Sequence, residues 1–380
     1  MRRLKFLNSL SKSKPKKQFQ SPRVLSQVHS QDFILLGVVV FLSLFGLLMV
    51  YDSSQVEAFA DFGDKYHFAK QQVMWVILGF SSMTFFSFFD YHRLQKIALP
   101  LLLFSFLLLL LVFVPGLGVA VGGAHRWLRV ASLTIQPAEI IKLAAIIFFA
   151  CIFQKEVRTA PFLIVFAAVS IIVGIFQRDL GSAIVFALIS FGVYFLAGAK
   201  LRYFLSLVTF GVIGFIGFIL SSAYRKQRVM AFLDPFTDPQ GFSYHISQIL
   251  IALGSGGLFG LGIGQSRQKF AYIPEVATDS IFSIIGEELG FFGCVIFISL
   301  LGYLILRAFK IAESAPDNYG KYLAAGLTLW IGSQAVVNLG AMVSLIPLTG
   351  VPLPFISYGG SALLANLVAV GILLNISKQS

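Results

Sequence analysis

The chain has 380 residues, of which 57% are apolar and 12% are charged, and its formal net charge at pH 7 is +12. A soluble domain has about 25% charged residues, so too little polar surface remains here to cover a water-soluble globule of this size. The composition therefore excludes a single soluble domain, a disordered chain, a collagen-like fibre and a disulfide scaffold, and it indicates a polytopic membrane protein.

Residues 1–31 form a basic segment ahead of the first apolar run. They carry eight Lys and Arg residues, and the first acid of the chain is Asp32. No apolar stretch follows within the first twenty residues, so the segment does not resemble a cleavable signal peptide. We expect a disordered cytoplasmic tail that contacts anionic lipid headgroups. Nucleic-acid binding is disfavoured, because apolar helices follow at once; residues 32–380 are expected to form the transmembrane domain.

Ten apolar segments predict membrane-spanning helices. The expected crossings are 33–50, 72–89, 97–115, 139–153, 160–176, 182–198, 203–222, 281–306, 322–343 and 361–376. With the N-terminus inside, 18 of the 29 Lys and Arg residues lie on the cytoplasmic side, as the positive-inside rule requires. The predicted fold class is an all-α polytopic membrane protein, a bundle of about ten transmembrane helices with both termini cytoplasmic.

The connections on the outer side are longer and richer in Gly, Pro and charge than the cytoplasmic ones. They are 51–71, 116–138, 223–280 and 344–360. Long loops on one face of a bundle usually carry function. We therefore expect the functional site on the extracytoplasmic side, with 223–280 as its large loop.

Ionisable residues at membrane depth are costly and indicate a partner or a function. Glu139 and Lys142, in the helix that Pro137 begins, are three residues apart and share a face. They form either a neutralised structural pair or the polar wall of an outward cavity. Arg126 is either a phosphate-binding cation or an interface anchor. Asp179 follows a tight turn and is expected to cap the next helix.

The 223–280 loop combines a short apolar helix, expected at 248–254, with a glycine-rich run and charged residues. Six glycines in residues 254–264 would let backbone N–H groups approach an anion, although no P-loop lysine follows. Lys269 would then hold a diphosphate, and a carboxylate, Glu275 or Asp279, would take a hydroxyl proton. The alternative for Asp279 is a plain helix cap.

Two further features concern buried polar groups. Glu287 and Glu288 lie inside the crossing that follows Asp279, so one of them must face a polar interior or stay protonated. The segment 345–361 has three prolines and three glycines and cannot be a continuous helix. Its backbone must be buried in protein or line a cavity.

These motifs together resemble the SEDS family (shape, elongation, division and sporulation). The resemblance covers the chain after the basic tail and is carried by Gly123–Trp127, Gln136–Glu139, Asp179–Gly181, Pro274–Gly290 and Asn338–Ser361. The run from Gly262 to Glu275 is more similar to division members than to elongation members. The chain departs from the pattern at Ala277 and Ser280, where histidine and phenylalanine are common.

The resemblance implies a peptidoglycan glycosyltransferase of cell division. Its substrate would be lipid II, a disaccharide-pentapeptide on undecaprenyl diphosphate, polymerised at the outer face of the bacterial cytoplasmic membrane at the septum. Asp279 matches the family's catalytic aspartate and would act as general base on the acceptor sugar hydroxyl. The matched substrate- and diphosphate-binding positions are Arg126, Lys269, Glu275, Glu139 and Lys142, and the matched cavity-lining positions are Gln136, Pro352, Ser357 and Gly360.

No organic cofactor is expected, because the diphosphate bond already activates the sugar; a divalent cation, magnesium or manganese, is an alternative holder of the leaving diphosphate. The implied partners are a class B penicillin-binding protein, which cross-links the strands, and other divisome proteins. Two other functions stay open: a flippase for the same lipid, and a non-catalytic scaffold that recruits the transpeptidase.

Overall fold

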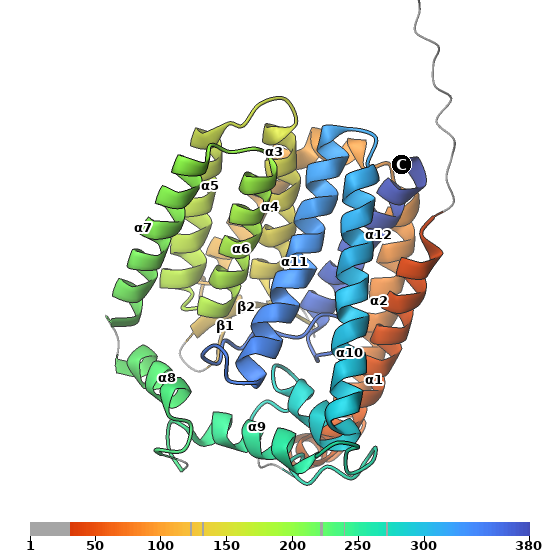
Figure 1. Cartoon of the computed structure of the whole chain (residues 1–380), viewed down its shortest axis with the longest axis vertical. Coiled ribbons are helices and arrows are strands. Elements are labelled where there is room, and N and C mark those ends of the chain that lie inside the picture. The colour runs from red at the N-terminus through yellow and green to blue at the C-terminus, as the bar shows by residue number, and fades with distance from the viewer. Residues whose placement is uncertain (1–30, 122–123, 131–132, 221–222, 239, 271–272) are drawn as a thin grey trace, which may run out of the picture.

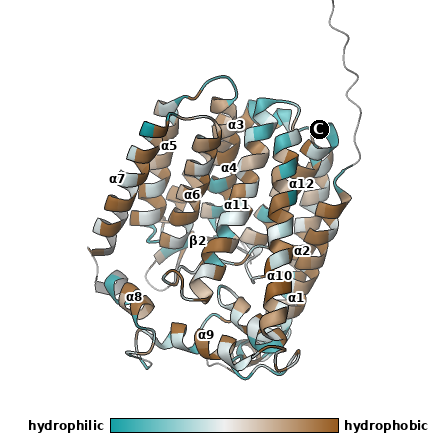
Figure 2. Ribbon diagram, in the orientation of Figure 1, coloured by the Kyte–Doolittle hydropathy of each residue, from teal (hydrophilic) through white to brown (hydrophobic). Residues whose placement is uncertain are grey.

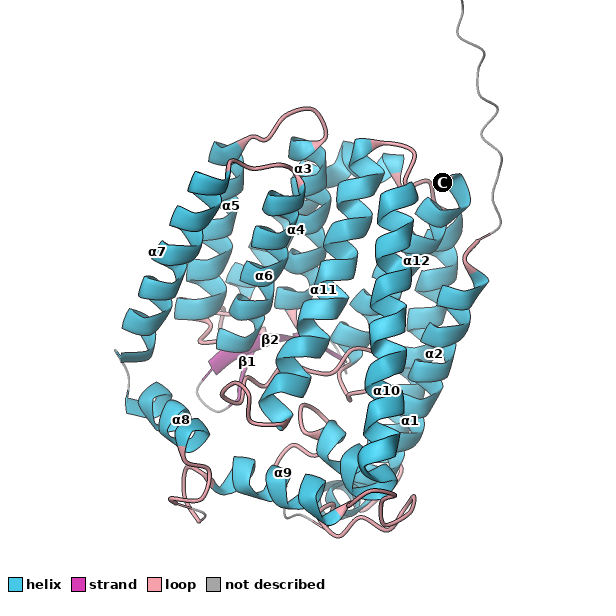
Figure 3. Cartoon of the chain, viewed as in Figure 1, coloured by secondary structure: helices cyan, strands magenta, loops and turns pink. Residues whose placement is uncertain are grey.

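The structure of the protein is a computed structural model that describes residues 31–121, 124–130, 133–220, 223–238, 240–270 and 273–380. The predicted basic tail, apart from Gln31, lies outside the described residues. The described chain is mainly helical (Figure 3).

Most of the helices run side by side along the long axis of the molecule (Figure 1). These elements are α1 (Phe33–Phe62), α2 (His67–Phe88), α3 (His92–Leu111), α4 (Pro137–Phe153), α5 (Thr159–Ser170) with its π-helical continuation η1 (Ile171–Phe176), α6 (Leu180–Leu196), α7 (Leu201–Leu220), α10 (Ile281–Ser314), α11 (Asn318–Met342) and α12 (Gly360–Gln379). Each predicted apolar segment overlaps one of them. Within the described ranges, six candidate spans are long and apolar enough to cross a membrane.

The start of α1 and the end of α12 lie at the same end of the bundle. The backbone N–H of Asp32 donates to Ser377 Oγ at 3.2 Å, and the Asp32 carboxylate pairs with Arg307 Nε at 2.6 Å. Apolar residues dominate the flanks of the bundle, and hydrophilic residues gather toward its two ends (Figure 2). This distribution is typical of a protein surrounded by lipid.

The opposite end of the bundle carries α8 (Ala223–Leu233), α9 (Tyr244–Ser255) and a small antiparallel sheet (Figure 1). The strands β1 (Gly118–Val121), β2 (Ala124–Val130) and β3 (Leu133–Ile135) pair in the order β1-β2-β3. The all-α prediction was therefore wrong for this segment, where β-branched and aromatic residues favour strands. The short helix expected at 248–254 is confirmed by α9, whereas α8 was not predicted.

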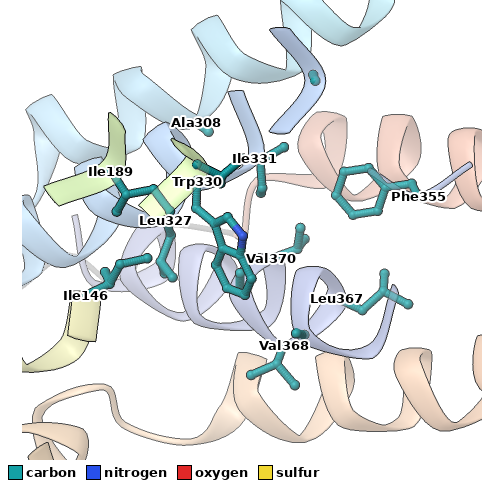
Figure 4. Close-up of a cluster of buried hydrophobic side chains, with 14 of the residues drawn as sticks. Ile146, Ile189, Ala308, Leu327, Trp330, Ile331, Phe355, Leu367, Val368 and Val370 are labelled. Atoms are coloured by element: carbon teal, nitrogen blue, oxygen red, sulfur yellow. The ribbon is translucent and has the colours of Figure 1, made fainter. Parts of the chain in front are cut away.

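The core lies where α11 and α12 pass through the centre of the bundle. Trp330 of α11 is fully buried in one cluster with Ile146, Leu327 and Val370 (Figure 4). Nearly the whole of α12 is buried, and Gly371 allows its close approach to α2, because a Cβ there would come 2.5 Å from the carbonyl oxygen of Met83. Such tight backbone contact is typical of helix packing in membranes.

The helix α10 is interrupted at Gly290. This residue has φ 69° and ψ −169°, so Ile281–Leu289 is a separate short helix ahead of the long span. A Cβ at position 290 would lie 2.2 Å from the backbone nitrogen of Gly260, so only glycine fits there. The predicted crossing 281–306 did not include this break. The break separates Ile281–Leu289 from the long helix that follows it.

Candidate active site

Asp279 lies where the chain enters α10, and its side chain is buried. Its backbone carbonyl accepts a hydrogen bond from Asn338 Nδ2 at 2.7 Å, and the same amide donates to the carbonyl of Val351 at 2.8 Å. One side chain of α11 thus ties the aspartate to the proline- and glycine-rich segment 344–360. The structure brings together three segments that the sequence analysis singled out separately.

The Asp279 carboxyl accepts a hydrogen bond from a neutral hydroxyl. Ser280 Oγ donates to its Oδ1 at 3.3 Å, and among the described residues it forms no ion pair. Burial raises the pKa of Asp279 to about 6, although the Ser280 hydrogen bond and the charge of Arg228 act in the other direction. A carboxyl with this pKa is mostly ionised at pH 7 and still basic enough to accept a proton. Ser280, not Asp279, holds the cap position of α10.

Glu275 is the second carboxylate of this site. Its φ of 50° is a left-handed conformation that residues other than glycine adopt rarely, and such backbone often occurs at functional sites. Burial and the negative charge of Asp279 raise the pKa of Glu275, while a hydrogen bond from Thr278 and the positive charge of Arg126 act in the other direction. The two predicted carboxylates therefore share one electrostatic environment.

Arg126 on β2 approaches the same region. Its guanidinium donates to the carbonyl oxygen of Arg178, while its buried Nε has no hydrogen-bond partner within the described part of the chain. An unpaired buried donor is costly unless a ligand completes it. The phosphate-binding interpretation of Arg126 stays a prediction that this geometry favours.

Gln136 connects the sheet to two helices. Its Nε2 donates to Asp179 Oδ2 at 3.0 Å, and its backbone N–H donates to Ser361 Oγ at 3.1 Å. Asp179 Oδ1 accepts from the N–H of Ser182 at 3.1 Å, which confirms the predicted cap of α6. Gln136 therefore holds three segments together, and its cavity-lining role stays a prediction.

The other predicted cavity residues fix the shape of the last loop. Ser357 Oγ accepts from the N–H of Leu353 at 2.8 Å. Gly360 lies against Trp75, and a Cβ there would come 2.0 Å from the indole ring. Pro352 packs beside the glycine that precedes Gly360. Residues 351–357 of this segment are mostly buried in protein, as the broken backbone requires, whereas 345–350 are partly or fully exposed.

Glu139 and Lys142 form the ion pair that their spacing predicts. Lys142 Nζ lies 2.7 Å from Glu139 Oε1, each side chain is 2% exposed, and the ammonium stands 5.4 Å from the centre of the Trp330 ring. This placement supports the structural-pair interpretation. Their role toward substrate stays a prediction.

Lys269 is held inside the protein by two carboxylates. Its ammonium lies 2.8 Å and 3.0 Å from the two oxygens of Asp52 and 3.4 Å from Glu288 Oε1. An ammonium has three protons, so its donors are engaged, and the predicted contact with a diphosphate would require it to leave two buried anions. Sequence analysis missed Asp52 of α1, which lies 217 positions from Lys269 in the sequence.

The loop around the glycine-rich run 254–264 does meet anions, but they belong to the protein. The N–H of Arg267 donates to the Glu287 carboxylate at 3.0 Å, and the N–H of Ser266 donates to Glu288 at 3.2 Å. Both glutamates thus face a polar interior, where one was expected. The glycines let the loop backbone pack against the break in α10.

His245 on α9 is a residue of this site that sequence analysis missed. Its Nε2 lies 2.8 Å from Ser280 Oγ, although the two residues are 35 positions apart. A cavity of about 190 Å³ opens beside it, between α8, α9 and residues 344–348, and Arg228 lines the same cavity. No three His, Cys, Asp or Glu side chains gather as a metal site among the residues that the structure describes.

Comparison with known proteins decides the family. The model of the FtsW, RodA and SpoVE family, described as cell cycle protein, matches residues 32–380. The chain belongs to this family. Its FtsW/RodA/SpoVE relatives include the probable peptidoglycan glycosyltransferase FtsW of Geobacter sp. (strain M18), with 39% identity over 93% of this chain and 99% of the relative. Stage V sporulation protein E of Bacillus subtilis (strain 168) is 42% identical over 92% of this chain and 98% of the relative.

Solved structures of the FtsW/RodA/SpoVE type share the fold. One belongs to a peptidoglycan synthase complex described for the structural coordination of polymerization and crosslinking, with a TM-score of 0.74, 27% identity and coverage of 91% of this chain and 97% of that one. The rod shape determining protein RodA of Thermus thermophilus has a TM-score of 0.66 and 27% identity, with coverage of 91% and 96%. The SEDS resemblance carried by the sequence motifs is confirmed.

Proposed function

We propose that this protein is a peptidoglycan glycosyltransferase of cell division, which polymerises lipid II and uses Asp279 as general base. The observation that carries this proposal is the buried Asp279 carboxyl, which has a raised pKa and, among the described residues, no ion-pair partner. Two other buried carboxylates, Glu139 and Asp52, are instead each neutralised by a lysine. The names of the FtsW relatives support the same activity.

We also propose a membrane arrangement. It has ten crossings, formed by α1 to α7 and α10 to α12, with both termini in the cytoplasm and Asp279 at the outer face of the bacterial cytoplasmic membrane, at the septum. The supporting observations are the excess of Lys and Arg on the cytoplasmic side and the position of α8 and α9 at the end of the bundle opposite the C-terminus (Figure 1).

The reaction balances as one substitution at the anomeric carbon of the glycan donor. The hydroxyl oxygen of the acceptor sugar forms the new glycosidic bond, and the bond from the anomeric carbon to the diphosphate oxygen breaks. The hydroxyl proton passes to the ionised Asp279, and undecaprenyl diphosphate leaves with its negative charge. General base catalysis of this kind contributes typically about 10²–10⁴-fold.

The leaving diphosphate needs positive charge, and two arginines of this region can supply it. Arg126 has a buried Nε without a partner in the described chain. Arg228 lines the cavity beside His245, and its charge acts on Asp279. Magnesium or manganese is proposed only as an ion that accompanies the substrate diphosphate, since magnesium is commonly held by one or two carboxylates together with substrate phosphates.

The proposed partners are a class B penicillin-binding protein, which would cross-link the new strands, and other divisome proteins. The supporting finding is that a chain of the same fold was solved as part of a peptidoglycan synthase complex.

The proposal is tested with Asp279→Asn, purified with the cognate transpeptidase and supplied with lipid II. We expect glycan polymer on a gel to fall by about 10²–10⁴-fold, the usual contribution of a general base. Asp64→Asn is the matched control, because Asp64 is an outer-loop carboxylate paired with exposed Lys70, and it should polymerise normally. Near-normal polymer from Asp279→Asn would remove Asp279 from this role.

The same assay separates the two other functions. A flippase would move labelled lipid II across vesicle bilayers while making no polymer. A scaffold would leave polymerisation with the partner, so that neither carboxylate variant would change the amount of glycan.

A further inference from the structure

Three side chains from two elements form a hydrogen-bonded series that ends at the proposed base. His245 Nε2 lies 2.8 Å from Ser280 Oγ, and Ser280 Oγ lies 3.3 Å from Asp279 Oδ1. A serine hydroxyl has one proton to donate. If that proton points at Asp279, the serine oxygen is left to act as an acceptor. His245 Nε2 lies where its N–H can donate a hydrogen bond to this oxygen.

The geometry points to His245 as a positioning residue that, through Ser280, aims a hydrogen-bond donor at the Asp279 carboxylate and keeps it ionised. This inference rests on the proposed function, since it assigns His245 a role only if Asp279 is the base. His245 itself does not contact the reacting atoms. It fixes the direction of one hydroxyl, and a donor directed at a carboxylate favours its charged form.

The surroundings of His245 keep its ring neutral, as this role requires. The ring lies in the first turn of α9, whose positive helix end disfavours a second positive charge. Burial lowers the pKa of His245 to about 4; the charge of Arg228 also lowers it, while Glu275 acts against both. A neutral imidazole with its proton on Nε2 donates to Ser280 and leaves Nδ1 unprotonated.

The charges that face this series come from each neighbouring element. Arg228 of α8 lines the cavity beside His245, Glu275 precedes Asp279 in the loop, and Arg126 of β2 acts on Glu275. From α11 the contacting group is the amide of Asn338, which is neutral and binds the backbone of Asp279. Within the described residues the Ser280 hydroxyl donates to Asp279 Oδ1, and a hydrogen bond from the Thr278 hydroxyl also lowers the pKa of Asp279, so Ser280 is the donor that His245 contacts.

The consequence is a specific pH dependence. Without the aimed hydroxyl, the pKa of Asp279 rises further, and the loss of rate on acidification begins at a higher pH. At high pH the carboxylate is ionised in either case, so the rate recovers. A structural defect would instead lower the rate at every pH.

The test measures the initial polymerisation rate at saturating lipid II between about pH 5.5 and 9.5 for His245→Leu, Ser280→Ala and the double variant. We expect each single variant to move the acid limb up by about one pH unit, which is roughly a fivefold loss at about pH 6 and about wild-type rate at about pH 9. The double variant should match Ser280→Ala alone, because both changes remove one hydrogen bond. His245→Gln, whose amide places N–H near the position of Nε2, should restore the acid limb.

The inference is overturned if His245→Leu leaves the acid limb in place, if it lowers the rate equally at all pH values, or if the effects of the two single variants add. These outcomes differ from failure of the proposed function. If only the inference about His245 failed, Asp279→Asn would still be inactive at every pH. An active Asp279→Asn would instead contradict the general-base role of Asp279, independently of the His245 variants.

Discussion

Two of the regions in which the bundle buries carboxylates differ in the groups that surround the charge. Around Lys269, the carboxylates of Asp52 and Glu288 share one ammonium and are almost fully enclosed. At the mouth of α10, Asp279 is also buried, yet its described partners are a hydroxyl and the backbone-binding amide of Asn338. A buried carboxylate paired with an ammonium is held in its ionised form, whereas burial without such a paired cation makes it easier for a carboxylate to take up a proton.

The largest expected effect is on the neutralised region. Lys269→Met leaves two buried carboxylates without a cation, so we expect the free energy of unfolding to fall by about 3–5 kcal/mol. Thermal unfolding in detergent, followed by loss of the monodisperse peak on size exclusion, measures it. Adding Asp52→Asn and Glu288→Gln should recover most of the loss; a triple variant as unstable as the single one would contradict the charge argument.

The opposite sign is expected at Asp279. Burial raises its pKa from the ordinary 3.8 to about 6, so the ionised form destabilises the fold above about pH 6, and this cost disappears below about pH 4, where the carboxyl is protonated in both states. At pH 8 the free energy of unfolding of Asp279→Asn should therefore exceed that of wild type by about 2–3 kcal/mol, and the variant should unfold at a higher temperature. Near pH 4 the two proteins should unfold at the same temperature. If wild type and Asp279→Asn were equally stable at both pH values, the charge of Asp279 would carry no cost, as expected for a neutralised carboxylate such as Glu139.

The amide that holds Asp279 should have a smaller effect on stability and a clear effect on rate. Asn338→Leu removes the donors to the carbonyls of Asp279 and Val351, so we expect a loss of about 1–3 kcal/mol and reduced polymerisation. Gln334→Leu on the same helix is the matched control, because its buried amide has no partner among the described residues. Equal losses in both variants would show that any buried amide of α11 matters equally.

The smallest effect is expected for an exposed pair. Asp64 and Lys70 lie 2.7 Å apart in solvent, where water and salt screen the interaction. Asp64→Asn should leave both the unfolding temperature and the polymer yield unchanged within error. A measurable loss of stability or polymer in Asp64→Asn would contradict the argument that burial determines how strongly a carboxylate affects this protein.

Sequence reasoning predicted the helical segments well, because lipid requires long apolar runs whose backbone bonds are internal. It also predicted the Glu139–Lys142 pair and the Asp179 cap, since both depend on neighbours three residues apart. Lys269 with Asp52, and His245 with Ser280, depend on packing between distant segments. No local pattern marks such partners, so Lys269 was expected to face a diphosphate and His245 was overlooked.

The interruption at Gly290 has a bearing on how this enzyme behaves in bilayers of different thickness. When a helix tilts to match the thickness of the bilayer, any segment that continues the same helix moves with it. Here the ladder of helical hydrogen bonds stops at Gly290, and Ile281–Leu289 is attached instead to the neighbouring loop, where Leu261 N–H donates to the carbonyl of Glu287 at 3.0 Å. A change in the inclination of Phe291–Ser314 would therefore leave the carboxylate where α9 and α11 hold it, and turnover would be insensitive to acyl-chain length.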